Sequence, residues 1–202
     1  MRKILVIAAL IIGVISCGKE EDSATGNYPE IVGTWSMVDG EVNGQSTSLN
    51  PDLTYEDKQA QDCAKRSTLK FLANGDFRGV FYMPQVEPEY RNNRYQFVYK
   101  GCNRALDLDD LATEGTIKYK IRNRKIIVYG KGEDGSSTEI EFFNIESLSG
   151  RTLKLSYSEE MKAQLRSAYE RGKQILQQNN IDIEIPENID VALNGFIIME
   201  KQ

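Results

Sequence analysis

Short stretches in which apolar and polar residues alternate recur along most of the chain, with turn-forming residues between them. Alternation with a period of two is typical of a β-strand that buries one face, and a series of such strands favours an all-β domain. Nine strands are expected, at residues 33–38, 68–72, 77–83, 95–99, 115–121, 125–129, 138–145, 152–157 and 191–200.

The connections between several of these strands are short enough to form hairpins. The clearest is Ala73-Asn74-Gly75-Asp76, because Asn-Gly accepts the positive φ angles of a tight turn. Arg122-Asn123-Arg124 and Ser149-Gly150 mark two further turns. Strands joined in this way form an antiparallel meander, which we expect to close into a barrel of about eight strands or to fold as a strongly curved sheet.

Two segments break the strand pattern and predict helices. Residues 51–63 predict a short helix with Pro51 near its start. Residues 158–178 predict an amphipathic helix of about 20 residues, with Ser158 as its cap, inserted before the last strand. This second helix is expected to pack across the barrel, and a mobile lid or a partner-binding helix are the alternatives.

The N-terminus has the layout of a secretory signal peptide. Arg2 and Lys3 precede the apolar run 4–15, and Ser16 leads to Cys17. A helix of twelve residues rises about 18 Å, well short of the ~30 Å hydrocarbon core. We therefore expect residues 1–16 to be removed after export rather than retained as a membrane span.

Val14-Ile15-Ser16-Cys17 resembles a lipobox, the site at which a lipoprotein is cleaved and its cysteine acylated. The resemblance implies a membrane anchor on Cys17, and cleavage that leaves a free thiol is the alternative. Residues 17–29 are expected to form a flexible tether. Lys19 and the acidic residues after it resemble the signal that carries Bacteroidetes lipoproteins to the outer face of the outer membrane. A solvated linker that specifies no leaflet is the alternative.

Residues 30–202 are long enough for one domain with a sizeable core. Removing residues 1–16 takes away Arg2 and Lys3 and no acidic residue, so the formal net charge moves from −5 to −7. An acidic chain is a poor match for nucleic acid. The expected partners are a membrane, reached through the anchor, and a small apolar molecule.

Only Cys63 and Cys102 remain once the anchor cysteine is set aside. Export permits disulfides, so these two are expected to form a structural bridge. No Cys-x-x-Cys redox pair is present. The chain also has no histidine, which excludes His-based acid–base catalysis, Ser-His-Asp hydrolysis and His-ligated zinc. We predict no catalytic residues, no metal site and no cofactor. Oxygen atoms of Asp107, Asp109, Asp110 and Glu114 could bind calcium. The alternative is that these residues form a solvated acidic loop without a metal.

Gly33-Thr34-Trp35, followed by a β-meander, resembles the start of a lipocalin, and the lipobox with paired cysteines is similar to lipocalin-like lipoproteins of Bacteroidetes. The resemblance implies that Gly33 and Trp35 lie at the base of a barrel. In lipocalins an arginine near the last strand stacks on this tryptophan, and the segment 196–200 contains no arginine.

The most direct expectation is a small apolar or amphipathic ligand inside the barrel. The candidate lining residues are Val38, Leu69, Phe71, Ile117, Ile127 and Phe143, with Ile121 and Ile198 as further inward candidates. The alternative is an interaction module with a filled barrel, and an enzyme using carboxylate or tyrosine chemistry is a third possibility. An aromatic series could also stack on sugar rings. It comprises Phe81, Tyr82, Tyr90, Tyr95, Phe97 and Tyr99, with Arg91 and Arg94 between them.

Replacing Cys17 tests the predicted membrane anchor. Cys17→Ala removes the only thiol at the end of the apolar run, so the protein should lose acylation and be left unprocessed or shed in soluble form. Metabolic labelling with a palmitate analogue measures this. Equal labelling of the variant and the wild type would contradict the anchor.

Overall fold

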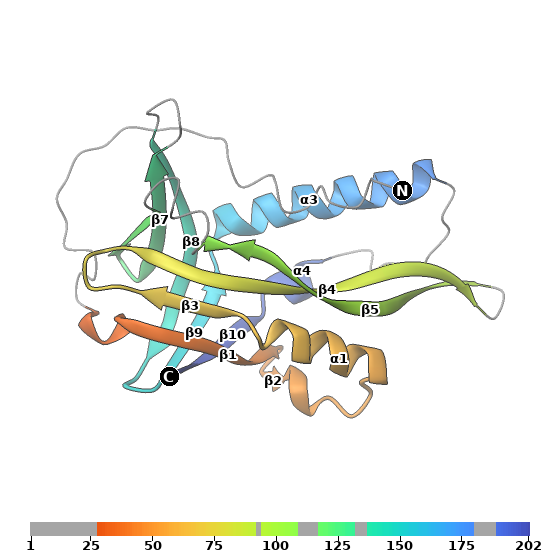
Figure 1. The fold of residues 1–202 in the computed structure, drawn as a ribbon, viewed down its shortest axis with the longest axis horizontal. Coiled ribbons are helices and arrows are strands. Elements are labelled where there is room, and N and C mark those ends of the chain that lie inside the picture. Colours follow the sequence, from red (N-terminus) through yellow and green to blue (C-terminus); the bar gives the residue numbers. More distant parts are fainter. Residues whose placement is uncertain (1–27, 92–93, 109–116, 132–136, 180–188) are drawn as a thin grey trace.

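The computed structural model describes residues 28–91, 94–108, 117–131, 137–179 and 189–202. Within these residues ten strands form one antiparallel sheet, so the expected all-β class is confirmed (Figure 1). The strands are β1 (Gly33–Val42), β2 (Gln45–Ser46), β3 (Thr68–Phe71), β4 (Phe77–Arg91), β5 (Arg94–Asp107), β6 (Lys118–Arg122), β7 (Lys125–Lys131), β8 (Ser137–Leu148), β9 (Thr152–Tyr157) and β10 (Phe196–Lys201).

The sheet order is β5-β4-β3-β1-β10-β9-β8-β7-β6, with β2 paired to β1. β6, at one end of this order, meets the β3–β4 turn near the other end. Asp76 and Lys118 form an isolated bridge there, and the Phe77 amide donates to the Ile117 carbonyl at 2.9 Å. The sheet therefore curves strongly round on itself. Among the described residues no continuous ladder joins its two ends, so the expected closed barrel is not confirmed.

Two of the three predicted turns contain residues in left-handed backbone conformations. Gly75 has φ +85° in the β3–β4 hairpin, and Asn123 and Arg124 have φ +51° and +64° between β6 and β7. The short β1–β2 hairpin was not expected, although Asn43-Gly44 carries the same Asn-Gly signal.

Both predicted helices are present. α1 (Tyr55–Ala64) begins four residues later than expected, at a capping box formed by Thr54 and Asp57. α3 (Glu159–Gln178) begins as predicted, with the Ser158 hydroxyl accepting a hydrogen bond from the Met161 amide at 3.0 Å. The start of α3 packs on β8. Two short 3₁₀ helices, η1 (Pro29–Ile31) and η2 (Thr47–Leu49), flank β1 and β2 in sequence.

The last expected strand is wrong in its first part. Asp190–Leu193 forms the short helix α4, and β10 begins only at Phe196. Asp190 pairs with Arg166 of α3 at 2.6 Å, which ties α4 to that helix. At Gly195 a Cβ atom would lie 2.7 Å from the Glu41 carbonyl oxygen, so the chain approaches β1 closely there and pairing starts just afterwards. No helix in the described part of the chain is long and apolar enough to cross a membrane.

The expected disulfide is confirmed. Cys63 near the end of α1 is bonded to Cys102 of β5, at a sequence separation of 39. α1 packs against both β4 and β5, and the bond fixes it to the stem of their hairpin. The bridge therefore links the helix to the edge of the sheet.

Removing the disulfide should destabilise the domain. For the double variant Cys63→Ser/Cys102→Ser we expect a loss of about 2–4 kcal/mol in the free energy of unfolding, because a loop of roughly 40 residues is no longer closed in the unfolded chain. Urea denaturation with and without reductant measures it. Reductant should lower the midpoint of the wild type and leave that of the double variant unchanged, and equal midpoints for both proteins without reductant would contradict the expectation.

Candidate functional site

Trp35 lies at the base of the curved sheet and has no exposed surface. Its indole Nε1 donates a hydrogen bond to the Ile31 carbonyl of η1 at 2.7 Å. Ile31 is itself fully buried, so η1 covers this end of the core. The tryptophan thus holds the chain entry against the first strand through both packing and a polar contact.

Lys201, at the end of β10, completes this cluster. Its ammonium lies 5.3 Å from the centre of the Trp35 ring and donates to the Glu30 carbonyl at 2.8 Å. Gly33 has φ +142°, and a Cβ there would lie 2.6 Å from Lys201 Cε. Sequence analysis missed this residue because the expected strand ended at position 200 and an arginine was sought. A positively charged residue of either type at the end of the last strand was the sequence signal that could have identified Lys201.

Aromatic side chains of the core contact one another inside the curved sheet. Phe71 contacts Phe77 and Tyr119 with ring centres 5.2 and 5.0 Å apart. From Phe77 the contacts continue through Phe142, at 6.3 Å, to Phe143, at 4.6 Å. These rings belong to one cluster with Trp35 and aliphatic residues of β3, β6, β7, β8, β9 and β10.

The six candidate ligand residues occupy different places. Leu69, Phe71 and Phe143 are members of the packed cluster, and Ile117 packs against it. Ile127 is buried outside the cluster. Its neighbour Ile126 is in the cluster, so alternation turns Ile127 to the opposite face of β7. Val38 is half-buried at a bulge in β1. The candidates therefore lie in different surroundings, and a ligand site formed by them stays a prediction. Of the two further candidates, Ile121 is in the cluster and Ile198 is half-buried.

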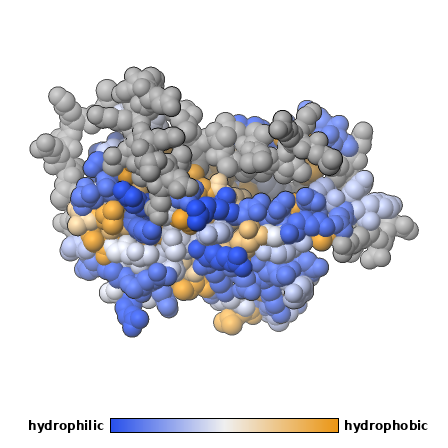
Figure 2. All heavy atoms as spheres, in the orientation of Figure 1, coloured by the Kyte–Doolittle hydropathy of each residue, from blue (hydrophilic) through white to orange (hydrophobic). Residues whose placement is uncertain are grey.

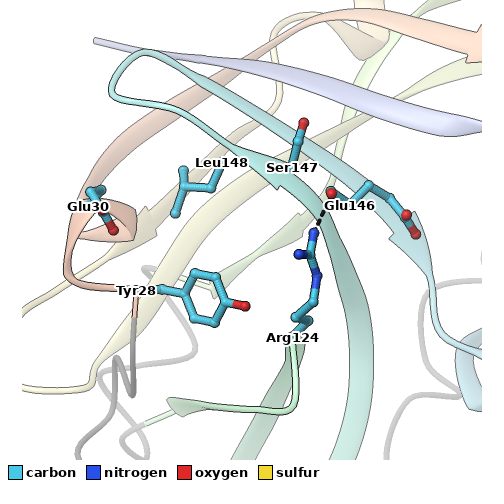
Figure 3. Close-up of a pocket in the computed structure, with 6 residues that line it drawn as sticks. All are labelled: Tyr28, Glu30, Arg124, Glu146, Ser147 and Leu148. Atoms are coloured by element: carbon cyan, nitrogen blue, oxygen red, sulfur yellow. Dashed lines mark hydrogen bonds between the residues drawn. The ribbon is translucent and has the colours of Figure 1, made fainter.

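An open pocket of about 350 Å³ lies beside η1 (Figure 3). Its lining residues are Tyr28, Glu30, Arg124, Glu146, Ser147 and Leu148. The Tyr28 ring points toward Arg124. Arg124 Nε donates to the Ile145 carbonyl at 2.9 Å, and a terminal nitrogen donates to the Glu146 carbonyl, so the guanidinium is engaged by β8. This hollow is charged and open, unlike the mostly apolar pockets that hold apolar ligands.

The described ionisable groups with shifted pKa values serve the fold. Partial burial would raise the pKa of Asp39, but hydrogen bonds from the Ser46 and Ser48 hydroxyls and from the Gly40 and Ser48 amides outweigh it and lower the pKa to about 2. Burial raises the pKa of Tyr119 to about 12, and its hydroxyl donates to the Leu72 carbonyl. Asp39 thereby fixes the β1–β2 hairpin, and Tyr119 stays protonated in the core.

The acidic loop considered for calcium falls largely outside the described residues, which include neither Asp109, Asp110 nor Glu114. Asp107 ends β5 and pairs with Arg104. Among the residues that the structure places, no group of three or more Asp, Glu, Cys or His side chains could hold a metal ion. Residues 1–16 and Cys17, the predicted anchor, also lie outside them.

The most distinctive surface is on the hairpin of β4 and β5. Beyond Val80, β4 has no partner except β5, so the two strands continue as a ribbon (Figure 1). Both bulges of this ladder are in β5, so side chains alternate without interruption along β4. Residues directly opposite one another share a face. One face, which we call the outer face, carries the pairs Pro84–Cys102, Val86–Tyr99, Pro88–Phe97 and Tyr90–Tyr95.

The outer face is apolar, whereas the opposite face of the same ribbon combines polar and charged residues with the apolar Met83 and Val98. On the outer face Val86, Phe97 and Tyr90 are 39, 41 and 63% exposed. The opposite face holds the ion pair of Glu89 with Lys100 and a hydrogen bond from Asn103 to Gln85. Among the aromatic residues singled out in the sequence, Phe81 packs against the core, whereas Tyr82, Tyr90, Tyr95, Phe97 and Tyr99 share the outer face.

Two features restrict access to the ribbon. The disulfide and α1 cover the stem of the outer face, at the Pro84–Cys102 pair. Along the free edge of β4, Pro84 and Pro88 have no N–H to donate. A partner strand could not form a regular ladder there. The exposed part of the outer face is therefore available mainly to side-on contact.

Comparisons with known proteins give no relative: no protein-family model matches the chain, and no curated protein or solved structure matches it significantly.

Neutralising Lys201 should weaken the base of the domain. Lys201→Met removes the cation above Trp35 and the hydrogen bond to the Glu30 carbonyl, and we expect a loss of about 1–2 kcal/mol. Thermal unfolding followed by Trp35 fluorescence measures both stability and local packing. Lys201→Arg keeps the charge and should retain most of the stability. A Met variant as stable as the wild type would contradict the role given to Lys201.

Proposed function

We propose that this protein is a lipid-anchored lipoprotein of the cell envelope whose β domain is an interaction module. It contacts its partner through the outer face of the β4–β5 ribbon. The observation that carries the proposal is an exposed row of apolar side chains on a ribbon that continues beyond the core. Apolar residues scattered singly over a surface do not indicate a binding surface, but here several large apolar side chains adjoin one another.

The packed aromatic cluster favours an interaction module over a carrier of apolar molecules. Its rings contact one another from Phe71 to Phe143 inside the curved sheet. Native proteins pack such cores to crystal-like density, and opening a cavity there would break many contacts. A small apolar ligand stays a prediction, which native mass spectrometry of protein purified without detergent would reveal as an added mass.

The lipocalin-like relationship and the location are parts of the same proposal. Gly33 and Trp35 at the chain entry support a lipocalin-like base, and Lys201 supplies the cation that the arginine provides in lipocalins. The β6 bridge to the β3–β4 turn supports a barrel that is interrupted where β4 and β5 leave the sheet. The lipobox and the polar tether support an outer-membrane lipoprotein with its domain on the cell surface.

Photo-crosslinking in intact cells tests the interaction surface. A photoreactive phenylalanine analogue at Phe97 is placed on the outer face, and the same analogue at Met83 serves as the matched control. Met83 is on the opposite face of the same ribbon and is similarly exposed, at 49% against 41%. Illumination should give discrete high-mass adducts only from position 97.

Equal adducts from both positions would mean non-specific labelling and would contradict the proposed surface. The absence of adducts at position 97, in cells where the protein is acylated and folded, would do the same. Unchanged thermal unfolding of both substituted proteins establishes that the ribbon is intact.

A further inference from the structure

We propose that the outer face of the ribbon binds a neutral glycan, with successive sugar rings stacked along the row of aromatic pairs. This rests on the interaction role proposed above and names the chemistry of the partner. Three adjacent cross-strand pairs form the row: Val86–Tyr99, Pro88–Phe97 and Tyr90–Tyr95. Neighbouring pairs are two residues apart, so the row is about 13 Å long and about 10 Å wide.

The chemistry of the row matches a sugar ring better than a peptide or an ion. Sugar rings present C–H groups on their faces and hydroxyls at their rims. Tyr90, Tyr95 and Tyr99 offer flat apolar rings with a hydroxyl at one end. Tyr90 and Tyr95 hold each other edge to face, with ring centres 5.2 Å apart and planes inclined at 67°, so one of these two rings at a time can lie flat beneath a sugar. Because this contact already restricts both side chains, binding costs little further side-chain freedom.

The distribution of charge favours a neutral partner. The three pairs contain no Asp, Glu, Lys or Arg, whereas Glu87, Glu89 and Lys100 belong to the other face or its bulge. A charged peptide would find no opposite charge within the row. A neutral glycan forms no ion pairs, so the lack of charged side chains in the row does not weaken its binding.

A second copy of the chain does not fit this row. A stable protein interface buries about 800 Å² on each partner, whereas a row of about 13 by 10 Å offers roughly 130 Å² in outline. Strand addition at the free edge of β4 is blocked by Pro84 and Pro88. A narrow, extended ligand matches the shape of the surface.

Calorimetric titration of the full acylated chain tests the inference, in a detergent without a sugar head group. The probes are oligosaccharides of β-1,4-glucose, α-1,4-glucose, β-1,4-N-acetylglucosamine and α-1,6-mannose, from two to six units. At least one series should bind, with affinity rising from the disaccharide and levelling off once the row is filled. Tyr90→Ala and Phe97→Ala should each weaken binding about fivefold or more, since a stacked ring contributes on the order of 1 kcal/mol.

Two control variants distinguish stacking on the outer face from nonspecific binding to exposed side chains. Tyr55→Ala removes a tyrosine of α1 that is 71% exposed, and Met83→Ala removes an apolar side chain from the opposite face of the ribbon. Both should bind as the wild type does. Equal losses in the control and outer-face variants, or no binding of any probe by the folded chain, would overturn the inference.

The crosslinked species from position 97 distinguish failure of the glycan inference from failure of the proposed function. Every adduct contains this polypeptide, so the purified adducts are digested with trypsin and their peptides identified by mass spectrometry. Adducts that lose mass on periodate treatment and yield peptides of this protein alone support a glycan. Adducts that yield peptides of a second protein and are unchanged by periodate overturn the glycan and leave the interaction module standing. No adduct at position 97 overturns both.

Discussion

Packing of aromatic rings inside one curved sheet is the constraint on which the rest of this domain depends. Strands far apart in the sheet order must come together to cover Phe71, Phe77, Tyr119 and Phe143, which are almost fully buried. Burial of such rings is the main favourable contribution to folding. It explains why β6 returns to the β3–β4 turn although no continuous ladder joins the two ends.

The base of the domain shows how polar contacts complete this packing. Trp35 alone would leave a buried indole N–H without a partner, which costs free energy. The Ile31 carbonyl accepts it, and that requires η1 to fold across the end of the sheet. Lys201 then joins the last strand to the same ring. Residues from both ends of the described chain thus depend on one another.

The ribbon has the opposite character, because its apolar side faces away from the core. Inside the domain β4 directs Phe77 and Phe81 toward the cluster. Farther along β4, the face that carries Phe77 and Phe81 presents polar groups such as Gln85 and Glu89. The other face of the strand is apolar there. Core formation does not require this reversal. The disulfide to α1 fixes the stem of the ribbon, so the apolar face is held in place rather than free to collapse onto the core.

Much of the fold could be predicted because its signals are local. Alternation predicted strands that overlap nine of those observed, Asn74-Gly75 predicted a hairpin, and Ser158 predicted the start of α3. The candidate site depended on less local information. Alternation could not say which face of a strand is buried, so it could not separate Ile126 from Ile127 or place Tyr90, Tyr95 and Phe97 on one exposed face. By itself the sequence determined the β class and the partner of Cys63. Tertiary structure decided the open ends of the sheet, the packing of the aromatic core and the apolar outer face, because these depend on cross-strand register and bulges between residues distant in sequence.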